Sequence, residues 1–235
     1  MGNFIYKKIE LSDTENMNQI YQLRFQVYGR ECGFVKEEDY PDGLEIDNYD
    51  KQSVHFAAMG DDGNVIATMR MILKGKLPLP VEKYFSAIRE KNLSTGQVPV
   101  EISRLVISKR LRRRKNDKLY YEPNLQDPEV VDDTPGGFLR RANPMIFGLY
   151  REMYQESKRT GITHWYSLME ESLWSLLQLH GFDFECIGEE VDIYGPVKPY
   201  VADILKIEQK VSTMYPKLFT YFTDGLNQPQ VPQQG

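Results

Sequence analysis

The run VPVEISRLVIS, residues 98–108, is the stretch that decides how this 235-residue chain folds. Its β-branched and aliphatic side chains predict a buried strand. A glutamate, Glu101, and an arginine, Arg104, interrupt the apolar run, and burying either charge is costly unless it is paired. Such a strand either holds a structural ion pair or lines a reactive cleft.

A basic run follows this strand directly. Six of the seven residues from 109 to 115 are basic: Lys109, Arg110, Arg112, Arg113, Arg114 and Lys115. An acid and an arginine on a strand, followed by a cationic turn, suit an enzyme that holds a phosphate-bearing carrier beside a general base.

The motif Glu-x-Ser-Arg at residues 101–104 resembles the signature of the acyl-homoserine-lactone (autoinducer) synthases and of the long-chain N-acyl amino acid synthases. Both belong to the GNAT acyltransferase superfamily. A second stretch, YPDGLEIDNYD at residues 40–50, followed by SVH at 53–55, resembles the acyltransferase branch associated with exosortase/PEP-CTERM systems. The likeness covers about residues 15–197.

The expected elements follow the order of an α/β protein with a mixed sheet. Strands are expected at residues 4–11, 53–59, 65–73, 98–108, 162–169, 182–188 and 190–197. Helices are expected at 81–91, 136–160 and 171–180, after a first helix that begins at a Ser12/Glu15 capping box and ends at Gly33. The resemblance implies a single GNAT-like (acyl-CoA N-acyltransferase) domain with a mixed central sheet flanked by helices.

One domain is expected because a chain of this length encloses one sizeable core. We assign the GNAT-like domain to residues 1–200 and predict a mobile insertion at 116–135, where the sequence is polar, acidic and aperiodic. A helical C-terminal extension is predicted at 201–226. The Pro/Gln-rich residues 227–235 are predicted to be a disordered tail.

Composition excludes several classes of function. The net charge of −5 argues against a general nucleic-acid binder. The two cysteines, Cys32 and Cys186, form no disulfide framework, and the three scattered histidines have no metal-ligand spacing, so no metal site is expected. No apolar run reaches the ~18 residues of a membrane span. These features predict a cytoplasmic protein without a membrane span.

Glu101 is predicted to be the catalytic base. Amide formation from a thioester needs a neutral amine, yet an amino group near pH 7 is mostly protonated. A carboxylate in a partly apolar cleft can take that proton, directly or through one water. The resemblance implies a similar role for this glutamate. The alternative is a structural partner of an arginine on a neighbouring strand.

Arg104 raises a geometric question. Strict alternation puts Glu101 and Ser103 on one face of the strand and Arg104 on the other, unless a β-bulge intervenes. GNAT folds commonly carry such a bulge, whose freed backbone N–H binds the thioester carbonyl and the developing oxyanion. We predict a bulge near residues 103–106 and group Ser103 and Arg104 with Glu101 as catalytic candidates. Arg104 would orient the acceptor or pair with Glu101, whereas a regular strand would make it structural.

Other charged residues correspond by position to the autoinducer-synthase pattern. Asp47 and Asp50 are predicted to form structural ion pairs. Arg24, which falls in the apolar stripe of the first helix, and Arg70 either join such pairs or bind the carboxylate of an amino acid acceptor through a bidentate fork.

The remaining substrate-binding candidates are apolar. Phe34 stands where the autoinducer synthases carry tryptophan, which weakens the case for their substrate, S-adenosylmethionine. Leu105, Val106 and Ile107 continue the strand beyond the motif and are included as substrate-binding candidates.

The basic run at 109–115 is interpreted as the donor site. It would hold the pyrophosphate of coenzyme A or dock an acidic acyl carrier protein, unless it is only a solvated turn. Most GNAT acetyltransferases cradle the pyrophosphate with a glycine-bearing loop. No glycine occurs from Leu105 to Pro135, which favours the carrier protein.

These residues together predict an N-acyltransferase without a permanently bound cofactor. It would move a medium or long acyl chain from acyl carrier protein, or from acyl-CoA, to the amine of an amino acid or related metabolite. The alternative is a catalytically silent accessory protein that binds an acyl donor in an exosortase/PEP-CTERM-type system. The sequence leaves the oligomeric state open.

Overall fold

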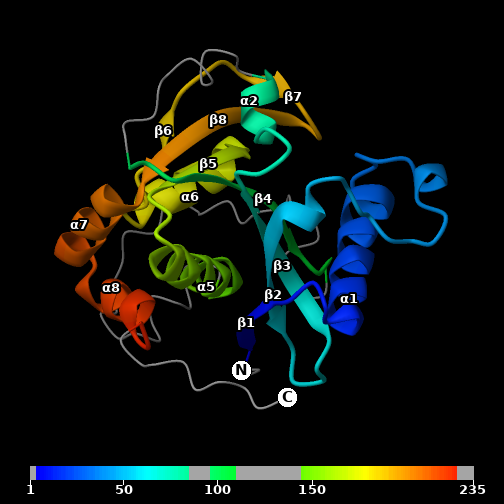
Figure 1. Ribbon diagram of the computed structural model, residues 1–235, viewed down its shortest axis with the longest axis horizontal. Helices are drawn as coiled ribbons and strands as arrows, with labels where there is room; N and C mark the ends of the chain where they lie inside the picture. The colour runs from blue at the N-terminus through cyan, green and yellow to red at the C-terminus, as the bar shows by residue number, and fades with distance from the viewer. Residues whose placement is uncertain (1–3, 85–95, 110–143, 227–235) are drawn as a thin grey trace, which may run out of the picture.

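The computed structural model describes residues 4–84, 96–109 and 144–226. Over these ranges the chain is an α/β protein with one open sheet of eight strands, flanked by helices (Figure 1). The strand order is β1-β2-β3-β4-β5-β8-β6, with β7 paired to β8. The predicted mixed sheet is confirmed, because β4 and β5 are parallel and the other pairs are antiparallel.

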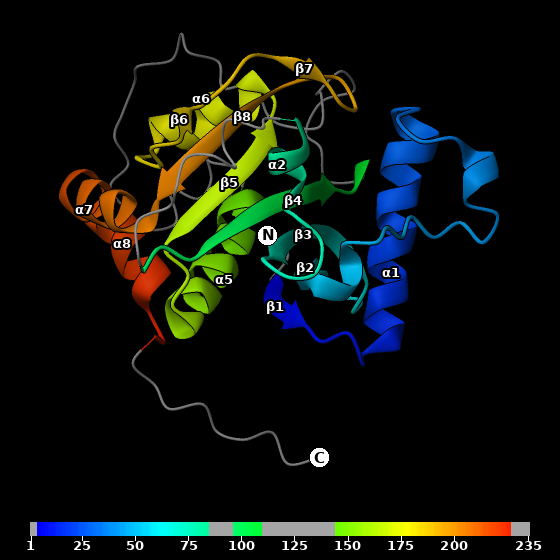
Figure 2. The ribbon, with the colours of Figure 1, turned by 45° about the horizontal axis from the view of Figure 1, so that its top comes forward.

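The first three strands form an antiparallel meander between two helices. They are β1 (Ile5–Ile9), β2 (Ser53–Met59) and β3 (Val65–Leu73). Successive side chains of β2 point to opposite faces. Ala57 therefore packs with the apolar face of α1 (Thr14–Phe25), while Phe56 and Ala58 join the core that contains α5 (Pro144–Thr160). Figure 2 shows α1 and α5 on opposite sides of these strands.

The first helix begins one residue later than predicted. The carboxylate of Asp13 accepts a hydrogen bond from the backbone N–H of Asn16 at 3.2 Å, so Asp13 is the N-cap and the Ser12/Glu15 capping box is wrong. Arg24 is fully buried, as its place in the apolar stripe predicts. The helix continues as a π-helix, η1 (Gln26–Glu31), before Gly33 adopts a φ of 65°.

The central part of the sheet follows the predicted order. The strands are β4 (Pro99–Ile107) and β5 (His164–Met169), and the helices are α2 (Pro80–Tyr84), α5 and α6 (Glu171–Leu179). The rest of the predicted helix at 81–91, the predicted start of α5 at 136 and the predicted insertion at 116–135 lie outside the described residues.

The C-terminal strands differ from the prediction. Instead of one strand at 190–197, β7 (Val191–Asp192) and β8 (Pro196–Asp203) flank a turn, and β8 lies between β5 and β6 (Glu185–Cys186). Prolines 196 and 199 conceal this strand in the sequence because proline cannot donate a ladder hydrogen bond.

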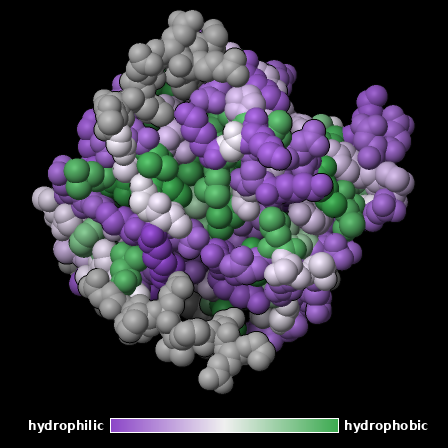
Figure 3. All heavy atoms as spheres, viewed as in Figure 1, coloured by the Kyte–Doolittle hydropathy of each residue, from purple (hydrophilic) through white to green (hydrophobic). Residues whose placement is uncertain are grey.

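Two helices occupy the region predicted to be a helical extension, α7 (Ile204–Met214) and α8 (Pro216–Thr223). Their apolar faces are buried in the main core, through Ile207, Val211 and Phe222 among others. On the face seen in Figure 3, apolar side chains form small groups separated by polar ones. Among the described helices, none has the length and apolar composition needed to cross a bilayer.

Candidate active site

A bulge in β4 shapes the site. From Ser103 to Val106 this strand advances three residues while its partner β3 advances only two. Arg104 has a φ of 54°, in the left-handed region that few non-glycine residues adopt. The predicted bulge is confirmed. Because of it, Glu101, Ser103 and Arg104 line the same pocket.

The pocket opens where β4 and β5 separate. Their parallel pairing runs from Pro99 opposite His164 to Ile102 opposite Ser167, and goes no further. A cavity of about 370 Å³ lies beyond this point, lined by residues 101–105 of β4 and 167–169 of β5.

Three arginines and three carboxylates form a closed ring of ion pairs beside the pocket. Each arginine contacts two of the carboxylates, and each carboxylate contacts two of the arginines. The order around the ring is Arg24, Glu45, Arg104, Asp47, Arg70, Asp50 and back to Arg24. Charges inside the ring therefore balance.

The distances in this ring are those of charge-assisted hydrogen bonds. Arg70 Nη1 donates to Asp47 Oδ1 at 2.6 Å and to Asp50 Oδ1 at 2.8 Å. Arg104 Nη2 donates to Glu45 Oε1 at 2.8 Å and to Asp47 Oδ2 at 3.0 Å. The ring ties the loop that carries the three carboxylates to α1, β3 and the β4 bulge.

The pKa values of the ring carboxyls are low. Burial raises the pKa of Asp50, but the charges and hydrogen bonds of Arg24 and Arg70 outweigh it and hold that pKa well below its usual range. Burial also raises the pKa values of Glu45 and Asp47, but the neighbouring arginines outweigh it, and both pKa values are lowered. All three groups are therefore ionised near neutral pH.

Glu45 is the ring member that sequence reasoning did not single out. Its side chain is completely buried between Arg24 and Arg104. The sequence does contain a signal for it, since three arginines at buried positions require three carboxylates, and Asp47 and Asp50 supply only two. Arg24 is equally buried and does not line the pocket, whereas Arg70 lines it and donates from Nε to Ser103 Oγ at 3.1 Å.

Glu101 lies outside the ring. Its side chain is buried, and Oε2 accepts the backbone N–H of Val81 in α2 at 2.7 Å. Among the described residues no lysine or arginine forms an ion pair with it. Burial raises the pKa of Glu101 to about 8, against the opposing effects of the Val81 N–H and the charge of Arg70. The carboxyl group is therefore mostly neutral at pH 7 and poised to ionise slightly above it.

The geometry separates the roles predicted for Arg104 and its neighbours. The bulge turns Arg104 toward Glu45 and Asp47, so the suggested ion pair with Glu101 is wrong. Arg70, on the neighbouring strand β3, is likewise paired with the loop aspartates rather than with Glu101.

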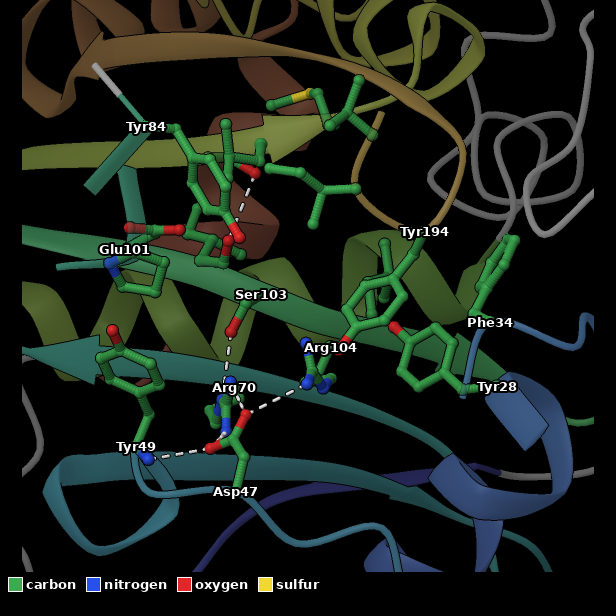
Figure 4. A pocket seen from close by; sticks show the side chains of 18 of the residues that line it. Tyr28, Phe34, Asp47, Tyr49, Arg70, Tyr84, Glu101, Ser103, Arg104 and Tyr194 are labelled. Atoms are coloured by element: carbon green, nitrogen blue, oxygen red, sulfur yellow. Dashed lines mark hydrogen bonds and ion pairs between the residues drawn. The ribbon is translucent and has the colours of Figure 1, made fainter. Parts of the chain in front are cut away.

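Aromatic side chains from three segments form one wall of the pocket. The ring centroids of Tyr28, Phe34 and Tyr194 lie 5.9 to 6.1 Å apart. Arg104 lies beside two of these rings, with its guanidinium carbon 5.4 Å from the Tyr28 centroid and 5.3 Å from that of Tyr194. Figure 4 shows this arrangement. Of the three aromatic residues, only Phe34 was predicted from the sequence.

The other predicted residues are dispersed. Leu105 lines the pocket, whereas Val106 and Ile107 are buried in the cores on either side of β4. Lys109 is exposed at the end of the strand. The remaining donor-site candidates, Arg110, Arg112, Arg113, Arg114 and Lys115, lie outside the described residues. Within the described ranges, no group of three or more histidine, cysteine or acidic side chains is arranged to hold a metal ion.

Part of this chain matches a known protein family. Residues 23–122 match the family described as the acetyltransferase (GNAT) domain. No curated protein matches the chain by sequence.

Solved structures share the fold. The AHL synthase LasI is 16% identical with a TM-score of 0.60, over 87% of this chain and 91% of that one. FeeM, an N-acyl amino acid synthase from uncultured soil microbes, is 12% identical with a TM-score of 0.58, over 89% and 94%. BjaI, a CoA-dependent acyl-homoserine lactone synthase solved with SAM and isopentyl-CoA, is 14% identical with a TM-score of 0.60, over 97% and 92%. The family match identifies an acetyltransferase (GNAT) domain at residues 23–122, and the solved structures share the fold of the chain.

Proposed function

We propose that this protein is an N-acyltransferase that moves an acyl chain from a thioester to an amine, with Glu101 as the general base. One observation carries the proposal. Glu101 is a buried carboxyl without a cationic partner among the described residues, its pKa is raised to about 8, and it lines the pocket where β4 and β5 separate. A base with a pKa near the working pH combines a useful ionised fraction with adequate basicity.

The reaction needs two features of β4. The ionised Glu101 takes a proton from the acceptor ammonium, directly or through one water. The neutral amine then attacks the thioester carbonyl carbon, the C–N bond forms, and the C–S bond breaks. The second amine proton passes to the departing thiolate. A backbone N–H at the Arg104 bulge would stabilise the developing oxyanion.

The proposal also names the acyl donor and the amine acceptor. The similar folds include a synthase described as CoA-dependent and another described as an N-acyl amino acid synthase. We favour a medium or long acyl chain carried by acyl carrier protein, because no glycine occurs from Leu105 to Pro135 to cradle a pyrophosphate. The proposed acceptor is an amino acid or related metabolite. The link to an exosortase/PEP-CTERM system stays a prediction.

The test is thiol release from acyl carrier protein and coenzyme A thioesters of graded chain length, with a mixture of amino acids and mass detection of the products. The variant Glu101→Gln keeps the shape of the side chain and should lower turnover about 10²- to 10⁴-fold while donor binding persists. Glu185→Gln is the matched control, because Glu185 is exposed on β6 and does not line the pocket. Equal turnover in Glu101→Gln and the wild type would overturn the proposal.

A further inference from the structure

One guanidinium nitrogen of Arg104 has no hydrogen-bond partner among the described residues. Its Nε and Nη2 donate to Glu45 and Asp47 at 2.8 to 3.3 Å. Its Nη1 has no hydrogen-bond partner among the described residues, although the side chain is only 13% exposed and lines the pocket. The arginines Arg24 and Arg70 differ, since every guanidinium nitrogen of each donates a hydrogen bond within the buried network.

Tyr194 and Tyr28 determine where that nitrogen points. Their rings are stacked 6.0 Å apart with an interplanar angle of 17°, and the Arg104 guanidinium lies within 5.4 Å of both centroids. Cation–π contacts with both aromatic rings restrict the guanidinium from one side, and the carboxylates of Glu45 and Asp47 hold its Nε and Nη2. The opposite edge, with Nη1, is therefore left for a ligand.

Tyr194 reaches this position through an unusual backbone. It has a φ of 59° in the turn between β7 and β8, and Gly195, with a φ of 98°, donates its N–H to Asp192 Oδ1 at 3.2 Å. A non-glycine residue in the left-handed region is uncommon, so the turn holds the ring over Arg104 at some cost. This contact joins the C-terminal strands to the β4 bulge across the pocket.

The residues that share the pocket with Arg104 indicate what its free edge would bind. Glu101 lies three positions before Arg104 on β4, and both residues line the same pocket because of the bulge. An amino acid carries an amine and a carboxylate on one carbon, so it presents a proton to the carboxyl base and an anion to the guanidinium. Lys83 also lines the pocket and adds positive charge.

We propose that Tyr194 is a positioning residue that orients Arg104 Nη1 to bind the carboxylate of an amino acid acceptor while Glu101 faces its amine. The inference rests on the proposed function and deepens it, since it makes a free carboxylate a requirement of the acceptor. The aromatic ring of Tyr194 is the part that matters, because the cation–π contact does not use the hydroxyl.

The direct test is calorimetric titration with N-dodecanoylglycine, which presents the carboxylate common to all N-acyl amino acids, and with its methyl ester. The wild type should bind the acid at least about tenfold more tightly than the ester, as expected for a charge-assisted hydrogen bond. Tyr194→Phe should keep this preference, and Tyr194→Leu should lose most of it. Equal binding of acid and ester by the wild type, or an unchanged preference in Tyr194→Leu, would overturn the inference.

Acyl transfer provides the second readout. With an amino acid acceptor, Tyr194→Leu should raise KM for the acceptor about tenfold with a smaller effect on kcat, while the thermal midpoint, monitored in parallel, stays near that of Tyr194→Phe. The two proposals fail separately. Glu101-dependent product formed equally well from amino acid methyl esters would refute only the role of the carboxylate, whereas turnover independent of Glu101 would refute the proposed function.

Discussion

Arg104 and Glu45 join the bulge of β4 to the acidic loop through a hydrogen bond of 2.8 Å between Nη2 and Oε1. The other oxygen of the same carboxylate accepts from Arg24 Nε on α1. Glu45 is thus shared by Arg24 and Arg104, which are 80 positions apart in the sequence. Each of these arginines also pairs with an aspartate, Arg24 with Asp50 and Arg104 with Asp47. Because every charged group in the ring is shared between two partners, the loss of any one member leaves buried charge unbalanced.

Replacing Glu45 by glutamine should therefore destabilise the fold. The ring would keep three arginines and only two carboxylates, and breaking a buried ion pair from one side costs about 3–5 kcal/mol. Urea unfolding at pH 7 measures the free energy of unfolding. Glu38→Gln is the control, because Glu38 is 77% exposed and its ion pair with Lys36 spans 3.7 Å, so its loss should cost under about 0.5 kcal/mol. Similar losses in the two variants would contradict a cooperative ring.

Acid should weaken the protein over a defined pH window. The pKa values of Glu45, Asp47 and Asp50 are lowered in the native state. The unfolded chain therefore binds protons first as the pH falls through about 4, and stability present above that value is lost progressively below it. Urea midpoints measured from pH 6 to pH 2.5 test this. Asp47→Asn should begin less stable at pH 6 and show a shallower decline; a wild-type midpoint that stays constant to pH 3 would refute the assignment.

Glu101 should have the opposite dependence. Its native pKa of about 8 is raised above the unfolded value, so the native state keeps a proton that the unfolded chain releases from about pH 4.5 upward. Its contribution to stability is therefore largest below pH 4.5 and declines as the pH rises toward 8, by at most about 1.4 kcal/mol per unit. Glu101→Gln removes this decline, so the difference in unfolding free energy between variant and wild type should shift in favour of the variant between pH 5 and pH 8. A pH-independent difference would mean that Glu101 titrates normally.

The same titration predicts the pH dependence of turnover. If the ionised Glu101 is the base, kcat/KM should rise with pH and level off above about 8, with an inflection near the pKa of the free enzyme. An acceptor amine with a low pKa keeps its own ionisation out of this range. A profile that levels off below pH 6 would exclude a carboxyl with the raised pKa as the base.

Gly148 in α5 should tolerate no side chain. A β-carbon at this position would overlap the ring of Tyr6 on β1. Gly148→Ala should therefore destabilise the fold by about 1–3 kcal/mol through overpacking, despite the higher helix propensity of alanine. Thermal unfolding of Gly148→Ala, of Tyr6→Ala and of the double variant measures it. The alanine should cost less in the Tyr6→Ala background than in the wild type, and an equal cost in both would show that the clash with this ring is not the cause.

Local patterns in the sequence were sufficient for the elements nearest the site. The hairpin of β2 and β3 was predicted with its bounds, because alternating apolar residues flank a turn rich in Asp, Gly and Asn. The bulge in β4 was predicted from the resemblance to GNAT folds, which commonly carry one there, since alternation alone puts Glu101 and Arg104 on opposite faces of the strand. By contrast, β8 was misplaced, since two prolines obscure its alternation and its pairing partner β5 lies 32 positions earlier, 196 − 164.

The sequence by itself determined which charged groups the fold has to accommodate. They are a carboxyl and an arginine on a buried strand, two further arginines at apolar positions, and an acidic loop that can neutralise the arginines. Tertiary structure alone decided the pairing. Glu45 rather than Glu101 is the partner of Arg104. Tyr194, which lies 90 positions later in the sequence, contacts Arg104 from the turn between β7 and β8. The reason is physical. Ion pairs and the desolvation that raises the pKa of Glu101 depend on distances between segments remote in sequence, and only the packed chain sets those distances.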